Sequence, residues 1–133
     1  MHEFEVNVRF SETDAFGPIN NTSYFIYLEE ARMKFFEALD LTTDAQPLSF
    51  LLASTNCNFT AQGYFNQLLT IRTSLTKVGT KSCDISHEIL CSQTGEIIAK
   101  GHAVLVCYNI ATQKSEPIPE KMKEKLISEI VLH

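Results

Sequence analysis

The sequence lacks several features that mark particular classes of protein. It has no block of consecutive basic residues, and its 16 Asp and Glu residues outnumber its 11 Lys and Arg residues, giving a formal net charge of −5. Without a basic patch there is no electrostatic footprint for a phosphate backbone, so we do not expect nucleic acid as a partner. No stretch approaches the ~18 apolar residues that indicate a membrane span. The N-terminus has neither the basic start nor the apolar run of a secretory signal, and we therefore expect a cytoplasmic protein with no membrane partner.

Cysteine is also sparse, and no two cysteines form a C-x-x-C pair. Each cysteine lies in an apolar or strand-like setting, which favours buried free thiols over the alternatives, disulfides or a metal site. The four residues are Cys57, Cys83, Cys91 and Cys107.

Length and patterning predict one α+β domain over residues 1–133, because 44% of the side chains are apolar and no repeat or linker divides the chain. Residues 3–10 alternate between apolar and polar, as a half-buried strand does. A long, mostly buried helix should begin between residues 20 and 23, after residues suited to capping, and run to residue 39. The rest predicts a short helical turn at 48–53, a strand near 56–59, a hairpin at 69–91, a central strand covered on both faces at 97–108, and a helix at 120–131.

The segment VRFSETDAFGPINNTSY at residues 8–24, followed by YLEEAR at residues 27–32, carries a longer pattern. It closely resembles the opening of the 4-hydroxybenzoyl-CoA thioesterase-like branch of the hotdog family, which reads R-[FY]-x-[ED]-x-D-x-x-G-x-[VI]-x-N-x-x-Y and then E-x-A-R. The resemblance implies a hotdog fold, in which an antiparallel sheet of about five strands wraps around one long buried helix, with a short C-terminal helix. It also implies an acyl-CoA thioesterase that forms a homodimer by joining sheets edge to edge, and a homotetramer by pairing again.

Some positions depart from that family pattern. Relatives commonly carry a Pro and then Gly-Asp where this chain has Gln62, Asn66 and Gln67. Relatives often have His where Pro18 stands, and one branch has His where Asn21 stands. These departures concern the acyl specificity and the assisting groups rather than the fold.

Thioester hydrolysis needs a nucleophile or a base that activates water, and a donor for the oxygen that becomes negatively charged. The resemblance makes Asp14 the catalytic carboxylate, although an Asp before a helix is more often a cap or turn former. Backbone N–H groups at the start of the helix, near Asn21, would form the oxyanion hole. Gly17 would let the loop turn closely between them. The sequence leaves open whether Asp14 attacks directly or deprotonates water, and neither route needs a metal or a cofactor.

Further residues are candidates for contacting the substrate. Asn20 or Asn21 could position water or the substrate carbonyl through its side-chain amide. Tyr24, Phe59 and Tyr64 are candidates for an acyl pocket, although core packing is the commoner fate of such residues. Ser82 resembles a family position near the thioester. Lys81, with Lys77 and Arg72 near the same hairpin, is a candidate for the phosphates of coenzyme A, against the alternative of a solvated strand edge.

Four other ionisable residues have mainly structural interpretations. Glu12 is expected to be structural, although it is close enough to raise the pKa of Asp14. Glu29 is expected to pair with Arg32 on the helix. His87 and His102 fall on strands without partners at ligand spacing, so we expect each to be satisfied within the sheet.

Two other functions compete with hydrolysis. A protein that binds an acyl-CoA or acyl-carrier thioester without catalysis remains possible from the sequence. A hotdog hydratase or dehydratase ranks lower, because it would need a His beside the acyl chain and residues 11–24 contain none. The sequence does not separate coenzyme A from acyl carrier protein as the carrier, and coenzyme A would enter only as part of the substrate.

Overall fold

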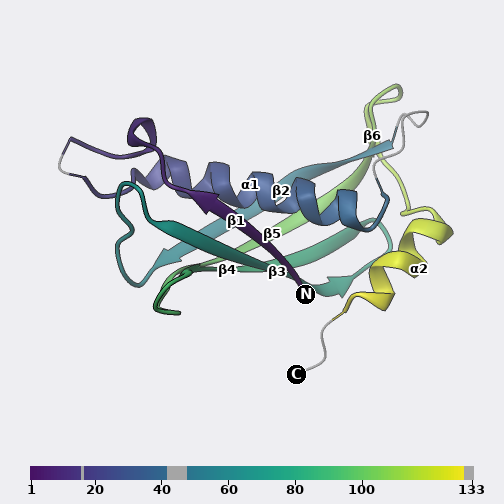
Figure 1. Cartoon of the computed structure of the whole chain (residues 1–133). Coiled ribbons are helices and arrows are strands. Elements are labelled where there is room, and N and C mark those ends of the chain that lie inside the picture. The colour runs from purple at the N-terminus through teal and green to yellow at the C-terminus, as the bar shows by residue number, and fades with distance from the viewer. Residues whose placement is uncertain (16, 42–47, 131–133) are drawn as a thin grey trace.

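The computed structural model describes residues 1–15, 17–41 and 48–130. An antiparallel sheet is built in the order β1-β3-β4-β5-β2, with the short β6 added beside β5 (Figure 1). The elements in chain order are β1 (His2–Asn7), the 3-10 turn η1 (Phe10–Glu12), α1 (Asn21–Ala38), β2 (Leu48–Phe59), β3 (Leu68–Val78), β4 (Ser82–Cys91), β5 (Ile97–Asn109), β6 (Lys114–Ser115) and α2 (Glu120–Ser128).

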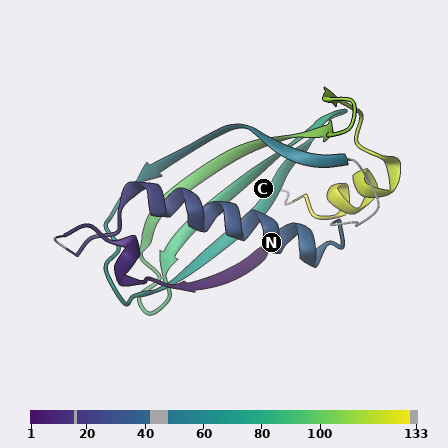
Figure 2. The same cartoon turned by 90° about the horizontal axis from the view of Figure 1, so that it is seen from above.

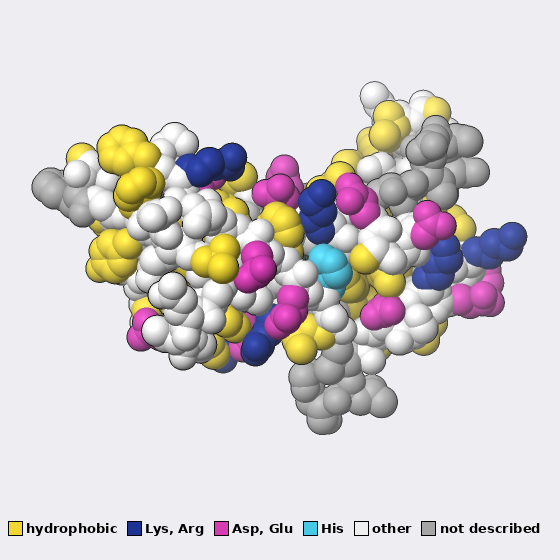
Figure 3. Space-filling model, in the orientation of Figure 1, with side chains coloured by type: hydrophobic (Ala, Val, Ile, Leu, Met, Phe, Trp, Pro, Cys, Tyr) yellow, Lys and Arg dark blue, Asp and Glu magenta, His cyan; other side chains and the backbone are white. Residues whose placement is uncertain are grey.

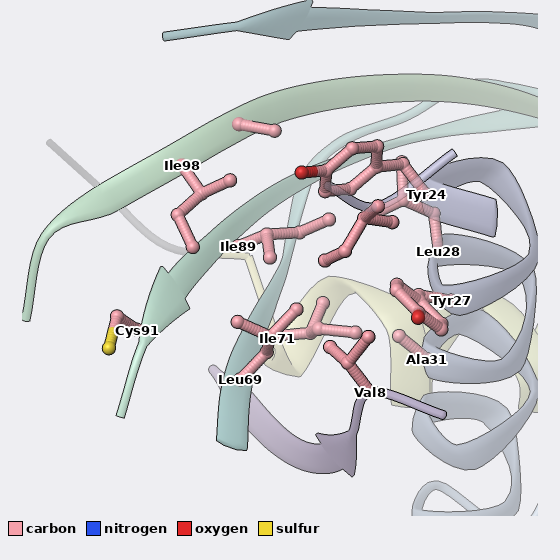
Figure 4. Packing of buried hydrophobic residues seen from close by; sticks show 12 residues of the cluster. Val8, Tyr24, Tyr27, Leu28, Ala31, Leu69, Ile71, Ile89, Cys91 and Ile98 are labelled. Carbon is pink, nitrogen blue, oxygen red and sulfur yellow. The ribbon is translucent and has the colours of Figure 1, made fainter. Parts of the chain in front are cut away.

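The long helix α1 lies along one face of the curved sheet, as the view from above shows (Figure 2). Tyr24, Tyr27, Leu28 and Ala31 recur at helical spacing and are at most 3% exposed. They meet the inward-facing residues of β3, β4 and β5, which alternate along each strand with residues of the outer face (Figure 4). The α+β fold with one long buried helix is therefore confirmed.

The strand β2 corrects one expectation. The apolar run at residues 48–53 is not a helical turn but the first half of β2, where Leu48 to Leu52 pair with Asn109 to Leu105 of β5. In an apolar run this short, the hydrophobic periodicity does not distinguish a helix from a strand. Here the segment is a strand because it pairs with β5. As a result β2 is one long edge strand.

Two element boundaries and the cover of β5 also differ from the expectations. The first strand ends at Asn7, and Phe10 lies in η1 with 74% of its surface exposed. The strand β5 is central, but its outer face is half-exposed in the single chain, so the expected cover on both faces is wrong. The C-terminal helix ends at Ser128, and the expected end at residue 131 lies outside the described residues.

The cysteines are free thiols, of which Cys57 is half-buried and the other three are buried. Within the described residues, no helix combines the length and apolar character needed to cross a membrane. In the same part of the chain, no group of three or more His, Cys, Asp or Glu side chains is placed to hold a metal ion.

Two polar side chains, His87 and Thr73, interrupt the core beneath α1. His87 is 1% exposed, and its Nδ1 lies 3.0 Å from the Thr73 hydroxyl, whereas its Nε2 has no partner among the described residues. Burial, with smaller contributions from Arg32 and His102, lowers the pKa of His87 to about 3. The expectation of a fully satisfied His87 is therefore only half right, while His102 has a partner in Asp84 at 3.4 Å.

Candidate active site

The loop before α1 closes on itself around Asp14. The Asp14 N–H donates to the Pro18 carbonyl at 2.8 Å, and the Gly17 N–H donates to the Asp14 carbonyl at 2.9 Å. Gly17 has a φ of +97°, in the left-handed region, and a Cβ there would meet no atom within 4 Å. Glycine is therefore needed at this position for its backbone angle rather than for space, as the sequence predicted.

Asn20 links Asp14 to the helix. Its φ of −65° and ψ of 140° are those of an N-cap, and its Oδ1 accepts from the Thr22 N–H at 2.8 Å. Its Nδ2 donates to Asp14 Oδ1 at 2.7 Å. Both ends of this amide are engaged, so Asn20 positions the carboxylate relative to the first turn of α1.

The start of α1 leaves one amide available. The Thr22 N–H is taken by the cap, and the Ser23 N–H donates to the Asn20 carbonyl at 3.0 Å. Among the described residues, the Asn21 N–H has no hydrogen-bond acceptor. It lies at the positive end of the helix dipole, where an anionic oxygen is stabilised.

Asp14 is not enclosed in the single chain. Its side chain is exposed, and a cavity of about 430 Å³ lies instead along the second half of α1, with Asp14 absent from its lining. One chain thus supplies a carboxylate and a helix amide, but it does not supply the walls that an acyl group needs.

A family model described as the thioesterase-like superfamily matches residues 8–126. The chain belongs to the thioesterase-like superfamily. It is 32% identical over 123 residues to the uncharacterized protein YsmA of Bacillus subtilis, covering 92% of this chain and 83% of that one. It is 29% identical over 124 residues to the long-chain acyl-CoA thioesterase FadM of Escherichia coli, covering 92% of this chain and 94% of FadM. A predicted thioesterase from Bacillus stearothermophilus has a similar structure, with a TM-score of 0.85, 29% identity, and 98% and 97% of the two chains covered.

In this member of the superfamily the predicted aromatic residues have different surroundings. Tyr24 is 3% exposed, its hydroxyl accepts from the Gly63 N–H at 3.0 Å, and its ring packs against Phe59 at 5.1 Å. Within the single chain Tyr24 is part of the core, and its expected role in an acyl pocket stays a prediction. Phe59 and Tyr64 are 43% and 47% exposed, respectively, and Tyr64 forms a backbone bridge with Pro18 of the Asp14 loop.

Hydrophobic side chains gather at the end of the molecule that carries this loop (Figure 3). Phe10 and Phe65 form an edge-to-face pair there, with ring centroids 5.8 Å apart. No sequence pattern indicates this pair, because the alternation at residues 3–10 predicts Phe10 on the buried face of a strand.

Glu12 supports the loop rather than the reaction. Its carboxylate accepts from the Tyr27 hydroxyl at 2.9 Å and from Arg9 Nη2 at 2.8 Å. Burial alone would raise the pKa of Glu12, but the hydrogen bonds from Arg9 and Tyr27 outweigh burial and lower the pKa. The structural interpretation of Glu12 agrees with this geometry.

Ser82 and Lys81 lie far from Asp14 within one chain. They occupy the turn after Val78, whereas the Asp14 loop contacts the turn before Leu68 through Phe65. The 11 residues of β3 between these turns span roughly 35 Å. The chain does not bring these two candidates to its own carboxylate.

Two expected charge groupings are also absent. Arg72 is engaged by Glu3 at 2.9 Å, part-way along β3, and does not join Lys77 and Lys81 at the hairpin. Among the described residues Arg32 forms no ion pair. The expected ion pair between Arg32 and Glu29 is therefore wrong.

Proposed function

We propose that this protein hydrolyses an acyl-CoA thioester to a free acid and coenzyme A, with Asp14 as the catalytic carboxylate. The observation that carries the proposal is the 2.7 Å hydrogen bond from Asn20, which ties Asp14 to the residue that caps α1. The next residue is Asn21, whose N–H has no acceptor among the described residues. The similarity to a long-chain acyl-CoA thioesterase over nearly the full length of both chains supports the reaction class.

The proposed chemistry follows one of two routes. As a base, Asp14 takes a proton from water, the hydroxide adds to the thioester carbonyl carbon, and the oxyanion accepts from the Asn21 N–H. The C–S bond then breaks, and the leaving thiolate takes the proton from Asp14, which gives the coenzyme A thiol and restores the Asp14 carboxylate. As a nucleophile, Asp14 itself adds to the carbonyl carbon, coenzyme A leaves, and water cleaves the resulting anhydride. Both routes use only Asp14, the helix amide and water.

The site needs walls, and we propose that a second copy of the chain supplies them. The strand β2 is a sheet edge of 12 residues with no charged side chain and no proline. Natural edges are usually protected by charges, prolines or bulges, and β2 carries only one irregularity of this kind, between Leu52 and Ser54. Its uncharged residues on either side of that irregularity are suited to pairing with another strand. Its Phe59 end packs against Tyr24, next to the start of α1. A homodimer joined along β2 would therefore place residues of one chain beside Asp14 of the other, and such dimers can pair again as tetramers.

A thiol-release assay against a panel of acyl-CoA thioesters tests the function. We expect hydrolysis by the wild type and a loss of at least ~10²-fold in kcat/KM for Asp14→Ala, typical of losing a catalytic acid or base. A loss below about threefold would place the chemistry on another residue. Running acyl carrier protein thioesters in parallel identifies the carrier.

The oxyanion hole has its own matched pair of variants. Asn21→Pro removes the N–H at the first helical position, where proline is well tolerated, and the extended backbone of Asn20 suits a following proline. We expect a loss of ~10²- to 10³-fold in kcat for Asn21→Pro, as for other oxyanion donors, and little change for Asn21→Ala, which keeps the amide. If no thioester is hydrolysed but acyl-CoA binds equally to the wild type and Asp14→Asn, the protein is an acyl-binding protein instead.

A further inference from the structure

A second site of unassigned function lies along the other half of α1. A cavity of about 430 Å³ opens between α1, the start of β2, the end of β5 and α2. Its walls are mostly apolar, with contributions from Met33, Phe36, Leu48, Phe50, Leu105 and Met122. This volume falls within the range of small-molecule pockets, and the apolar lining suits an aliphatic chain.

Arg32 is the feature that gives this cavity a chemical preference. It lines the cavity and is 7% exposed, and among the described residues its guanidinium makes neither a hydrogen bond nor an ion pair. Glu29, the other charged residue of the lining, has an exposed side chain one helical turn away. No Arg32 nitrogen is among the fully buried atoms that lack a partner, so the largely buried guanidinium keeps a narrow contact with water, which an entering anion would replace.

The surroundings of Arg32 add to this preference. Burial lowers the pKa of the Arg32 guanidinium, and Glu29 opposes that effect only in part. No described carboxylate lies within ion-pair distance of Arg32, so the charge at this position of the cavity is positive.

We propose that this cavity binds a free medium-chain fatty acid, with its carboxylate on the Arg32 guanidinium and its alkyl chain against Met33, Phe36 and Phe50. A carboxylate matches the planar fork of a guanidinium, which can donate two parallel hydrogen bonds to it. The site is distinct from the Asp14 site of the same chain: Arg32 lies 12 residues beyond Asn20, or ~18 Å along the helix, with the buried Tyr24 and Tyr27 between them. The inference goes beyond the proposed hydrolysis and does not depend on it.

Calorimetric titration of the full chain with octanoate and with octanol tests the proposal at neutral pH, where a carboxylic acid is ionised. We expect octanoate to bind at least ~10-fold more tightly than octanol to the wild type, because only the carboxylate pairs with the buried cation. Arg32→Met keeps the length and apolar stem of the side chain, and we expect it to abolish this difference. Lys34→Met removes an exposed cation of the same helix and should change nothing.

The calorimetric titrations test the proposed fatty-acid site by binding alone and do not depend on catalytic activity. Equal affinity for octanoate and octanol in the wild type would overturn it, as would undetectable binding of octanoate or an unchanged preference in Arg32→Met. Should Arg32→Met fail to fold, as judged by circular dichroism, the octanoate and octanol comparison on the wild type still decides. Because thiol release is not measured, an inactive protein that binds octanoate through Arg32 would contradict the proposed hydrolysis alone.

Discussion

Asn20 and Asp14 are joined by a 2.7 Å hydrogen bond, made by the same side chain that caps α1. The position of the carboxylate is thereby tied to the first turn of the helix, where the free Asn21 amide lies. Asn20 thus acts as a positioning residue, and its loss should affect stability and activity in separable ways.

For Asn20→Ala we expect a loss of about 1 kcal/mol in the free energy of unfolding, the usual effect of removing an N-cap, and a loss of roughly 10- to 100-fold in kcat. Asn20→Ser restores a capping oxygen but not the donor to Asp14. It should recover most of the stability and little of the activity, as measured by urea denaturation and thiol release. Full activity in Asn20→Ala would show that Asp14 needs no anchor.

Gly17→Ala should cost about 1–2 kcal/mol of stability, because φ is +97° and alanine is strained there although space is open. We expect activity to fall with it, since this turn carries Asp14. Gly95→Ala is a matched control, because Gly95 also has a positive φ, +76°, and open space, but lies in the turn between β4 and β5. Its unfolding free energy should drop similarly while kcat/KM stays at the wild-type value.

The buried His87 should make the fold sensitive to acid. Its pKa falls from 6.5 to about 3 in the fold, so below pH 6.5 the unfolded chain takes up a proton that the folded chain does not. Stability is therefore complete above the unfolded pKa and declines as pH falls toward 3, by up to about 1.4 kcal/mol per pH unit from this residue. His87→Gln should flatten the dependence of urea midpoints on pH. An unaltered pH profile in His87→Gln would contradict the assignment.

If two copies of the chain pair along β2, a charged substitution on that strand should separate them. Ser54 is exposed near the middle of β2, so in an antiparallel pair of identical strands two lysines at this position would face each other closely. We expect Ser54→Lys to reduce the mass measured by light scattering to that of one chain, and to reduce activity, because the second wall of the site is lost. Gln93→Lys, in the exposed turn after β4, should keep the wild-type mass. A wild type that is itself a single chain at all concentrations would refute the dimer.

The helix and its site were the most predictable parts of the molecule. The start of α1 follows from Asn20 as a capping residue, and the spacing of Asp14, Gly17 and Asn21 places them in one loop at that start. The start of the helix is local in sequence and follows from capping chemistry, whereas the choice of Asp14 as the catalytic carboxylate came from the family pattern.

The parts that could not be predicted depend on contacts between distant segments. Residues 48–53 became a strand because β5 was available to pair with them. Ser82 and Lys81 belong to the family pattern, but a pattern gives no distance, and in one chain they lie at the far end of β3. The hydroxyl of Tyr27 reaches Glu12 across 15 positions, a contact that no local rule anticipates.

The uncharged edge of β2 also matters before any assembly exists. A newly made chain at low concentration presents the 12-residue strand β2, paired with β5 on one side only, with neither charge nor proline on its open edge to repel an incorrect neighbour. The yield of folded protein should therefore depend on the concentration of newly made chains. Enough copies must be present to cover each edge promptly, and slow, dilute synthesis should favour capture of the strand by unrelated chains and loss to insoluble material.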